Sequence, residues 1–216
     1  MITVVIPVVN PELANSLLAN VEANSLKASQ ILIIDNTAEG YSPEADLPIT
    51  VHRGPLSVNK SWQWGFSAAS KEAELISVLN DDLIIMPNFF ESILDAFRYE
   101  KCAVACPFTV TGDQPLALAP FGGCLPMQKR EGWAFTIQKK ILDKIRPIPQ
   151  VLDTFCGDDW IWHETTLIHK MLWWKTFRTT VYHYCGVSVE KMIDREVFRT
   201  ERQLYTKIAR GKMEYD

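Results

Sequence analysis

The stretch that most constrains the fold is residues 75–86, where two short apolar runs enclose Asn80-Asp81-Asp82 and Pro87 follows. Apolar runs rich in branched residues are typical of strands buried on both faces of a parallel sheet. Two carboxylates at the end of such a strand are costly to desolvate unless a cation lies beside them. The stretch therefore indicates a divalent metal held by carboxylate and phosphate oxygens. A solvated Asn-Asp-Asp turn is the simpler alternative.

Strand and helix patterns alternate through the first hundred residues. Asn10 and Pro11 suit the N-cap and the first position of a helix. Apolar spacing predicts strands at residues 2–7, 30–34 and 48–52 and helices at residues 11–21, 56–70 and 88–99. This alternation predicts an α/β fold with a mostly parallel central sheet flanked by helices. Ligands of such sheets bind beyond the carboxyl ends of the strands, where the sequence places Pro7, Asp35, His52 and the Asp81-Asp82 pair.

The second half of the chain is less regular. Strands are expected at residues 103–108, 133–137 and 179–184, and helices around 141–145, from 160 to about 171 and from 188 to about 210. Gly122 and Gly123 suit a close approach of the backbone to a ligand. Asp158 and Asp159 open one of these helices, where the helix dipole favours acidic side chains. A helix cap is their simplest role.

Charge is distributed unevenly along the chain. Residues 1–100 hold 5 Lys and Arg against 13 Asp and Glu, and the remainder holds 17 against 13. The two halves therefore face different partners or different parts of one ligand. The five cysteines lack the paired spacing of a zinc site, which is typical of reduced thiols. Because no apolar run reaches the roughly 20 residues that span a bilayer, we expect a cytoplasmic protein.

Six motifs occur in an order that resembles family 2 glycosyltransferases of the GT-A fold. They are IPVVN at 6–10, IIDNT at 33–37, NKSWQWGFSA at 59–68, NDD at 80–82, FCGDD at 155–159 and VYHYCGVS at 181–188. These segments are similar to the family's opening strand, VVDDGS segment, N-x-G-x-x-x-A helix, DxD motif, G-E-D motif and H-x-x-G-x-S segment. The resemblance implies one GT-A domain over residues 1–190, with a nucleotide-binding half at 1–100, an acceptor half at 101–190 and a helical extension at 191–216.

The resemblance also implies a metal-dependent transfer of a hexosyl group from a nucleotide sugar, with UDP as the expected nucleotide. Asp82 is the first candidate ligand of Mn²⁺ or Mg²⁺, Asp81 shares the metal or lies near the ribose, and His183 completes the site. Asp35 matches the family's base-contacting aspartate. Contacts to the nucleotide sugar are expected from Pro7, Asn10, Asp35, Asn59, Trp62, Asn80, Asp81, Gly122 and Gly123.

A general base must deprotonate the acceptor hydroxyl during the transfer. Asp159, in the segment that resembles the G-E-D motif, is the first candidate, and Asp158 is the second. A base on the sugar face opposite the leaving group gives a single displacement with inversion of the anomeric centre.

The acceptor stays open between a glycan or other cell-surface precursor, a small molecule, and hydroxymethylated bases of viral DNA. The basic second half of the chain supports DNA. Two further alternatives are an inactive nucleotide-sugar binding protein and a nucleotidyltransferase. The latter requires a glycine-rich, basic loop after the first strand, which Val8-Val9-Asn10-Pro11 does not provide.

Basic residues recur along one face of the expected C-terminal helix. Lys191, Arg195, Arg199 and Arg202 follow one another at spacings of four, four and three residues. This stripe is either a solvated face or a contact for an anionic acceptor. Apolar residues on another face, which include Val197 and Ile208, are expected to pack against the domain.

Overall fold

The computed structural model describes residues 1–54, 56–111, 122–184 and 195–211. The strands within these residues are β1 (Ile2–Val8), β2 (Gln30–Asp35), β3 (Ile49–Arg53), β4 (Leu75–Leu79), β5 (Leu83–Ile85), β6 (Cys102–Thr111), β7 (Cys124–Pro126), β8 (Ala134–Gln138) and β9 (Leu172–His183). The helices are α1 (Pro11–Glu22), α2 (Val58–Ala68), α3 (Phe89–Ala96), α4 (Lys139–Leu142), α5 (Gly157–Trp162) and α6 (Arg195–Ala209), and α5 continues into a π-helical turn, η1 (His163–Ile168).

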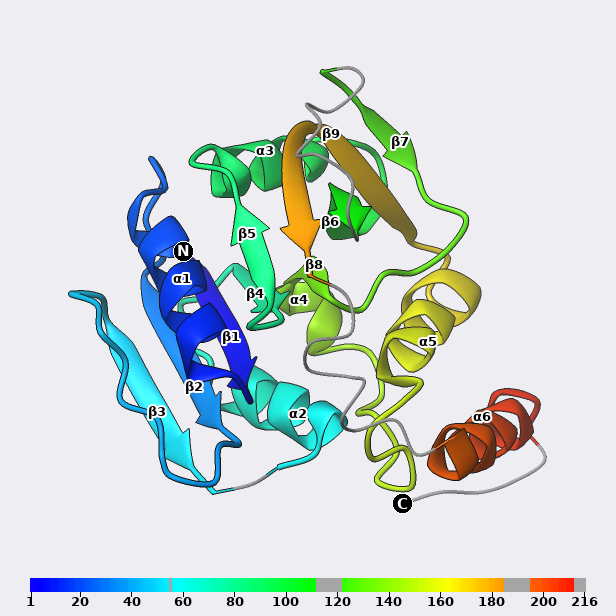
Figure 1. Cartoon of the computed structure of the whole chain (residues 1–216). Helices are drawn as coiled ribbons and strands as arrows, with labels where there is room; N and C mark the ends of the chain where they lie inside the picture. The colour runs from blue at the N-terminus through cyan, green and yellow to red at the C-terminus, as the bar shows by residue number, and fades with distance from the viewer. Residues whose placement is uncertain (55, 112–121, 185–194, 212–216) are drawn as a thin grey trace.

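The described strands form one mixed sheet in the order β3-β2-β1-β4-β8-β6-β9-β5, with β7 paired to β9 (Figure 1). The first four strands in this order are parallel, as the alternating pattern of the first hundred residues predicts. Beyond β4 the sheet is mixed, because β8 runs antiparallel to both β4 and β6 while β6 and β9 are parallel. All five residues of β4 are buried, which confirms the interpretation of the apolar run before Asn80.

Two apolar cores lie on the two faces of the sheet. Val4 and Ile6 of β1 point into the core that contains the buried residues of α1 and α3. Val5, between them, points into the other core together with residues of α2, α4 and α5. This alternation follows from the two-residue period of a strand. Ile208 of α6 also joins the second core, so the C-terminal helix packs against the same face as α2.

Gly65 allows α2 to lie unusually close to β1. A Cβ atom at this position would stand 2.4 Å from Val5 Cγ1 and 2.7 Å from Val5 Cγ2. Val5 is fully buried and β-branched, so its side chain has little freedom to move away.

We therefore expect Gly65→Ala to lower the free energy of unfolding by about 2 kcal/mol through overpacking. Ser67→Ala, on the same helix, is the matched control. Urea unfolding followed by circular dichroism measures both. A Gly65→Ala variant as stable as the wild type would show that α2 can shift away from β1 without cost.

Several elements differ in extent from their predicted ranges. Strand β1 continues through Pro7 to Val8 because Pro7 keeps its register with Ile34 and loses only one N–H from the ladder. The helix expected from residue 160 begins at Gly157 and becomes π-helical at His163. Strand β9 begins at Leu172, seven residues before the predicted strand, because it pairs with β6 along most of its length.

Within the described ranges, no helix combines the length and the hydrophobicity needed to cross a bilayer. Cys102, Cys106, Cys124 and Cys156 are buried free thiols, as expected. Burial raises the pKa of Cys102 to about 12 and that of Cys156 to about 11, so both stay protonated at neutral pH. Cys185 and the start of the predicted C-terminal helix fall outside the described residues.

Candidate active site

Asp81 fastens the end of β4 to the loop that follows β1. Its Oδ2 atom accepts hydrogen bonds from the backbone N–H groups of Val9 and Asn10, each at 2.7 Å. The side chain of Asn10 in turn caps α1 by accepting from two backbone N–H groups, as predicted. Asp81 was expected to share a metal or to lie near a ribose. The structure gives one of its oxygens a structural role at the carboxyl end of the sheet.

Asp82, unlike Asp81, is buried without hydrogen-bond donors from the described residues. Its side chain is 1% exposed, and neither carboxylate oxygen accepts a hydrogen bond from the residues that the structure describes. His183 Nε2, at the end of β9, lies 3.2 Å from Asp82 Oδ1. The pairing of Leu83 with His183 and the bond from Tyr184 N to Asp82 O hold the two residues together. The structure thus brings together two distant residues that the resemblance assigned to one metal site.

A buried carboxylate that lacks hydrogen-bond donors fits a cation ligand, because a nearby positive charge offsets the cost of its desolvation. Among the described residues, no group of three or more His, Cys, Asp or Glu side chains gathers at one point. Of the residues that the structure describes, Asp82 and His183 would thus supply two ligands. A divalent ion there would need further oxygens, which the phosphates of a nucleotide supply in many enzymes.

Residues 130–133 contact both His183 and the two acidic residues at the start of α5, Asp158 and Asp159, which we call the acid pair. The Trp133 ring stacks on His183 at 5.3 Å between centroids, and its Nε1 donates to Thr109 Oγ1 at 3.1 Å. The neighbouring Gly132 lies against Asp158, where an added Cβ would approach the carboxyl group to 3.2 Å. Because adjacent Cα atoms are about 3.8 Å apart, His183 and Asp158 flank the same two residues.

Asp159 is held by two arginines from distant parts of the chain. Its Oδ2 accepts from Arg130 Nη2 at 2.6 Å and from Arg202 Nη1 of α6 at 2.5 Å. No hydrogen bond from the described residues reaches Oδ1. Among the described residues, the carboxylate is therefore oriented through Oδ2 alone.

Asp158 is held less tightly than Asp159. Its only charged partner among the described residues is Arg130, whose Nε lies 3.4 Å from Asp158 Oδ2. Burial raises the pKa of Asp158, the Arg130 guanidinium opposes the shift, and the Asp159 carboxylate adds to it. A carboxylate with a raised pKa is a stronger proton acceptor than an ordinary aspartate.

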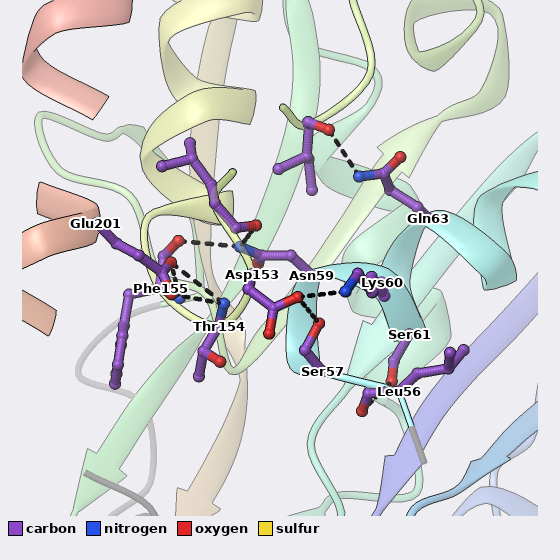
Figure 2. Close-up of polar contacts among 12 residues, drawn as sticks. Leu56, Ser57, Asn59, Lys60, Ser61, Gln63, Asp153, Thr154, Phe155 and Glu201 are labelled. Atoms are coloured by element: carbon purple, nitrogen blue, oxygen red, sulfur yellow. Dashed lines mark hydrogen bonds and ion pairs between the residues drawn. The ribbon is translucent and has the colours of Figure 1, made fainter. Parts of the chain in front are cut away.

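The segment that leads into the acid pair is tied to α2, as Figure 2 shows. Asn59 Nδ2 donates to the carbonyl oxygens of Leu152 at 2.7 Å and Phe155 at 2.9 Å. Asp153 accepts from Ser57 Oγ at 2.8 Å and pairs with Lys60 at 2.7 Å. The segment is thus fixed at several points of the first turns of α2.

These contacts correct two expectations about nucleotide contacts. Asn59 is 1% exposed and serves the 152–155 segment, and Trp62 is 4% exposed and packs edge-on against Phe135. In this structure neither side chain presents surface to a ligand. These two residues of the motif at 59–68 thus contribute to the packing beside the site.

Asp35 is engaged on both oxygens. Oδ1 accepts from Thr37 N and Oγ1, and Oδ2 accepts from Tyr41 N at 2.6 Å and Arg53 at 3.2 Å. Burial alone would raise the pKa of Asp35, but the bonds from Thr37 and Tyr41 and the charge of Arg53 outweigh it and lower the pKa. A contact to a nucleotide base would require one of these partners to release its oxygen.

We expect Asp35→Asn to lower stability by about 2 kcal/mol at pH 7, because an amide nitrogen would face donors. A lowered pKa stabilises the fold above the unfolded value of 3.8, and this contribution is lost as the pH falls through the folded value. The difference between wild type and variant should therefore shrink at pH 3. Urea unfolding at both pH values measures it, and a difference independent of pH would contradict the assignment.

The expected contacts of the Gly122-Gly123 pair and of Pro7 and Asn80 with the nucleotide sugar have different outcomes. Gly122 O and Gly123 O accept from Arg178 and Phe177 at the middle of β9. Phe177 is six residues from His183, or about 20 Å along the strand, so the structure does not bring this glycine pair to Asp82. Pro7 and Asn80 are partly exposed at the carboxyl ends of β1 and β4, where ligands of parallel sheets bind.

The sequence did not reveal Arg130, and it did not reveal that Arg202 pairs with Asp159. Arg202 was assigned to a basic stripe, but its guanidinium binds Asp159. Arg195 and Arg199 of the same stripe are exposed, and Lys191 falls outside the described residues. The apolar face is also only partly correct, because Ile208 is buried whereas Val197 is 40% exposed. No spacing rule links Arg130 and Arg202 to Asp159, since the pairing arises only from the tertiary fold.

No family model and no curated protein sequence matches the chain. Among solved structures, it is similar to S. aureus TarS 1-349 at a TM-score of 0.63, and to the same protein in complex with UDP at 0.66. Both matches have 11% identity and cover 94% of this chain. The chain spans 63% of the TarS structures, which is less than two thirds of their length. TarS is a GT-A-type glycosyltransferase, and the likeness confirms the GT-A fold expected from the motifs.

Proposed function

We propose that the protein is a metal-dependent, inverting glycosyltransferase that moves a sugar from a nucleotide sugar, with UDP as the nucleotide, to an acceptor hydroxyl. The observation that carries the proposal is the buried Asp82 carboxylate without hydrogen-bond donors from the described residues, 3.2 Å from His183 at the carboxyl edge of the sheet. The GT-A fold, shared with a UDP-bound structure, supports the choice of donor.

Asp82 and His183 would hold a divalent ion together with the donor's phosphates. Bound there, Mg²⁺ or Mn²⁺ would supply positive charge to the diphosphate, the leaving group of the reaction. The residues of the chain perform the remaining tasks. Trp133 keeps the His183 ring in place, and Asp81 holds the loop after β1 against the end of β4.

We assign the general base to Asp159. Arg130 and Arg202 fix its Oδ2, so Oδ1 can accept the proton of an acceptor hydroxyl without further movement of the side chain. Asp158 is the alternative, favoured by its raised pKa and looser contacts. In either case the acceptor would bind at the amino end of α5, and attack from that side would invert the anomeric carbon.

The loop after β1 bears on the nucleotidyltransferase alternative. A phosphate-binding loop at this place would turn its backbone N–H groups toward the phosphates. Here the N–H groups of Val9 and Asn10 both donate to Asp81. The loop is thus occupied by a carboxylate, which disfavours phosphate binding by this loop.

Binding of nucleotide sugars tests the proposal. A panel with different bases and sugars is added to the protein with Mg²⁺, with Mn²⁺ and with chelator, and the melting temperature and the release of free nucleotide are recorded. A ligand at 100 times its Kd stabilises the folded state by about 2.7 kcal/mol, so a metal-dependent rise is expected for UDP-sugars. Glycans, small molecules and hydroxymethylated DNA are then compared as acceptors. Nucleotide-dependent stabilisation without turnover for any acceptor would identify an inactive binding protein instead.

A further inference from the structure

Helix α6 reaches the acid pair from the C-terminal part of the chain. Arg202 Nη1 donates to Asp159 Oδ2, and the Tyr205 hydroxyl donates to the backbone carbonyl of Asp159 at 3.3 Å. The Arg202 guanidinium also lies over the Tyr205 ring, with its Cζ atom 5.5 Å from the ring centroid. Two successive turns of α6 thus contact the same residue of α5.

The preceding residue of α6 holds the segment before the acid pair. Glu201 is 4% exposed, and its carboxylate accepts from Thr154 N at 3.1 and 3.2 Å and from Phe155 N at 2.8 Å. Figure 2 shows Glu201 approaching these N–H groups from the side opposite Asn59 of α2. The segment at 152–155 is therefore held by hydrogen bonds to α2 on one side and to α6 on the other.

Only Cys156 and Gly157 separate the 152–155 segment from the acid pair, and both are conformationally restricted. Cys156 adopts a left-handed backbone conformation with φ of 62°, and Gly157 begins α5 directly after it. An added Cβ at Gly157 would lie 2.1 Å from Asn59 Oδ1, so the backbone is packed tightly here. A displacement of Thr154 or Phe155 would consequently be passed on to Asp158 and Asp159.

A purely structural role explains Glu201 poorly. A buried carboxylate is costly to desolvate, and no ion pair with a cation is present for Glu201 among the described residues. Burial raises its pKa, and the backbone bonds from Phe155 and Thr154 oppose the shift. A neutral apolar residue would stabilise the packing of α6 at lower cost. The Glu201 carboxylate instead fixes the positions of the backbone N–H groups of Thr154 and Phe155, close to the acid pair.

We propose that Glu201 and Arg202 are positioning residues of the transfer reaction, with Arg202 orienting Asp159 and Glu201 fixing the segment that carries the acid pair. This inference rests on the proposed glycosyltransferase activity. It makes α6 part of the active site, although none of its residues needs to contact the sugar. The C-terminal helix thereby has a role other than that of a solvated basic stripe.

The test compares Arg202→Met, Arg202→Lys and Glu201→Gln with the wild type, with Arg210→Met as a control for loss of an exposed charge. Steady-state kinetics with a UDP-sugar and Mg²⁺ give kcat and the donor KM, and melting temperatures report folding. A misplacement of about 1 Å can reduce a rate about 100-fold. We expect kcat to fall about 10- to 100-fold in Arg202→Met and Glu201→Gln, with the donor KM changed less than about twofold. Arg202→Lys keeps the charge but loses the forked geometry, so it should restore part of the rate.

Each outcome decides a different point. If the wild type is active and both variants match Arg210→Met in kcat, the positioning role is overturned and the proposed function stands. If kcat falls only in proportion to the folded fraction, and Arg202→Lys restores nothing, the role is structural and the inference is again overturned. An inactive wild type overturns the proposed function and the inference with it. Should Arg202→Met fail to fold, the kcat values of Arg202→Lys and Glu201→Gln decide between the two roles.

Discussion

Asp159→Asn should reduce kcat for sugar transfer by about 10³-fold, because it removes the proposed general base of the reaction. The donor KM should change little, since a base acts on the acceptor and not on the nucleotide. The substitution keeps the size of the side chain, so the contacts with Arg130 and Arg202 lose charge but not shape. Initial rates of UDP release at saturating donor and acceptor measure the effect.

Asp158→Asn is the matched control, because it changes the adjacent carboxylate of the same helix. If Asp159 is the base, the Asp158 variant keeps a much larger share of the rate. The reverse order of the two losses would transfer the assignment to Asp158, whose pKa is raised by burial. A loss of stability in Asp159→Asn without a loss of kcat in the folded protein would reduce Asp159 to a structural partner of the two arginines. Melting temperatures separate these cases.

Asp82→Asn should abolish the response of the protein to divalent metal. The charge stabilisation supplied by a bound ion amounts to several kcal/mol, and a loss of about 3 kcal/mol lowers the rate more than 100-fold. Stability should respond differently. In chelator the variant should melt no lower than the wild type, because the native carboxylate is buried without hydrogen-bond donors from the described residues. With metal and UDP, only the wild type should gain stability.

Glu72→Gln provides a control for this prediction, since it removes an exposed carboxylate from the loop before β4. Calorimetry with and without metal gives the melting temperatures, and the transfer assay gives the rate. A wild type that melts identically in chelator and in Mg²⁺ with UDP, together with full activity of Asp82→Asn, would exclude a metal at this position.

The sequence predicted the parts of the fold that depend on local patterns. The buried strand before Asn80, the N-cap at Asn10 and the parallel strands of the first hundred residues follow from residue periods and capping preferences. The GT-A fold was expected from the order of motifs along the chain, and the structural likeness at 11% identity confirms that fold. The same order of motifs assigned Asp82 and His183 to one metal site, and the two side chains lie 3.2 Å apart.

The remaining features depend on tertiary contacts that no local pattern encodes. Asn59 of α2 was expected to contact the nucleotide sugar, but its amide donates inward to backbone carbonyls. Arg130 and Arg202 come from a loop and from the C-terminal helix and meet only at Asp159. Gly122 and Gly123 were placed at the sugar by analogy, whereas the pairing of the chain with β9 holds them beside Phe177 and Arg178.

Transfer of a sugar from a UDP-sugar, with inversion and with a divalent metal, is the activity on which the roles of Asp82, Asp159 and α6 all depend. Proton NMR of the wild-type protein with a UDP-sugar, Mg²⁺ and the best acceptor of the screen tests it most directly, because the coupling constant of the anomeric proton reports the configuration. We expect a product whose anomeric configuration is opposite to that of the donor, and no product in chelator. A product with retained configuration, or equal turnover without metal, would contradict the proposed reaction.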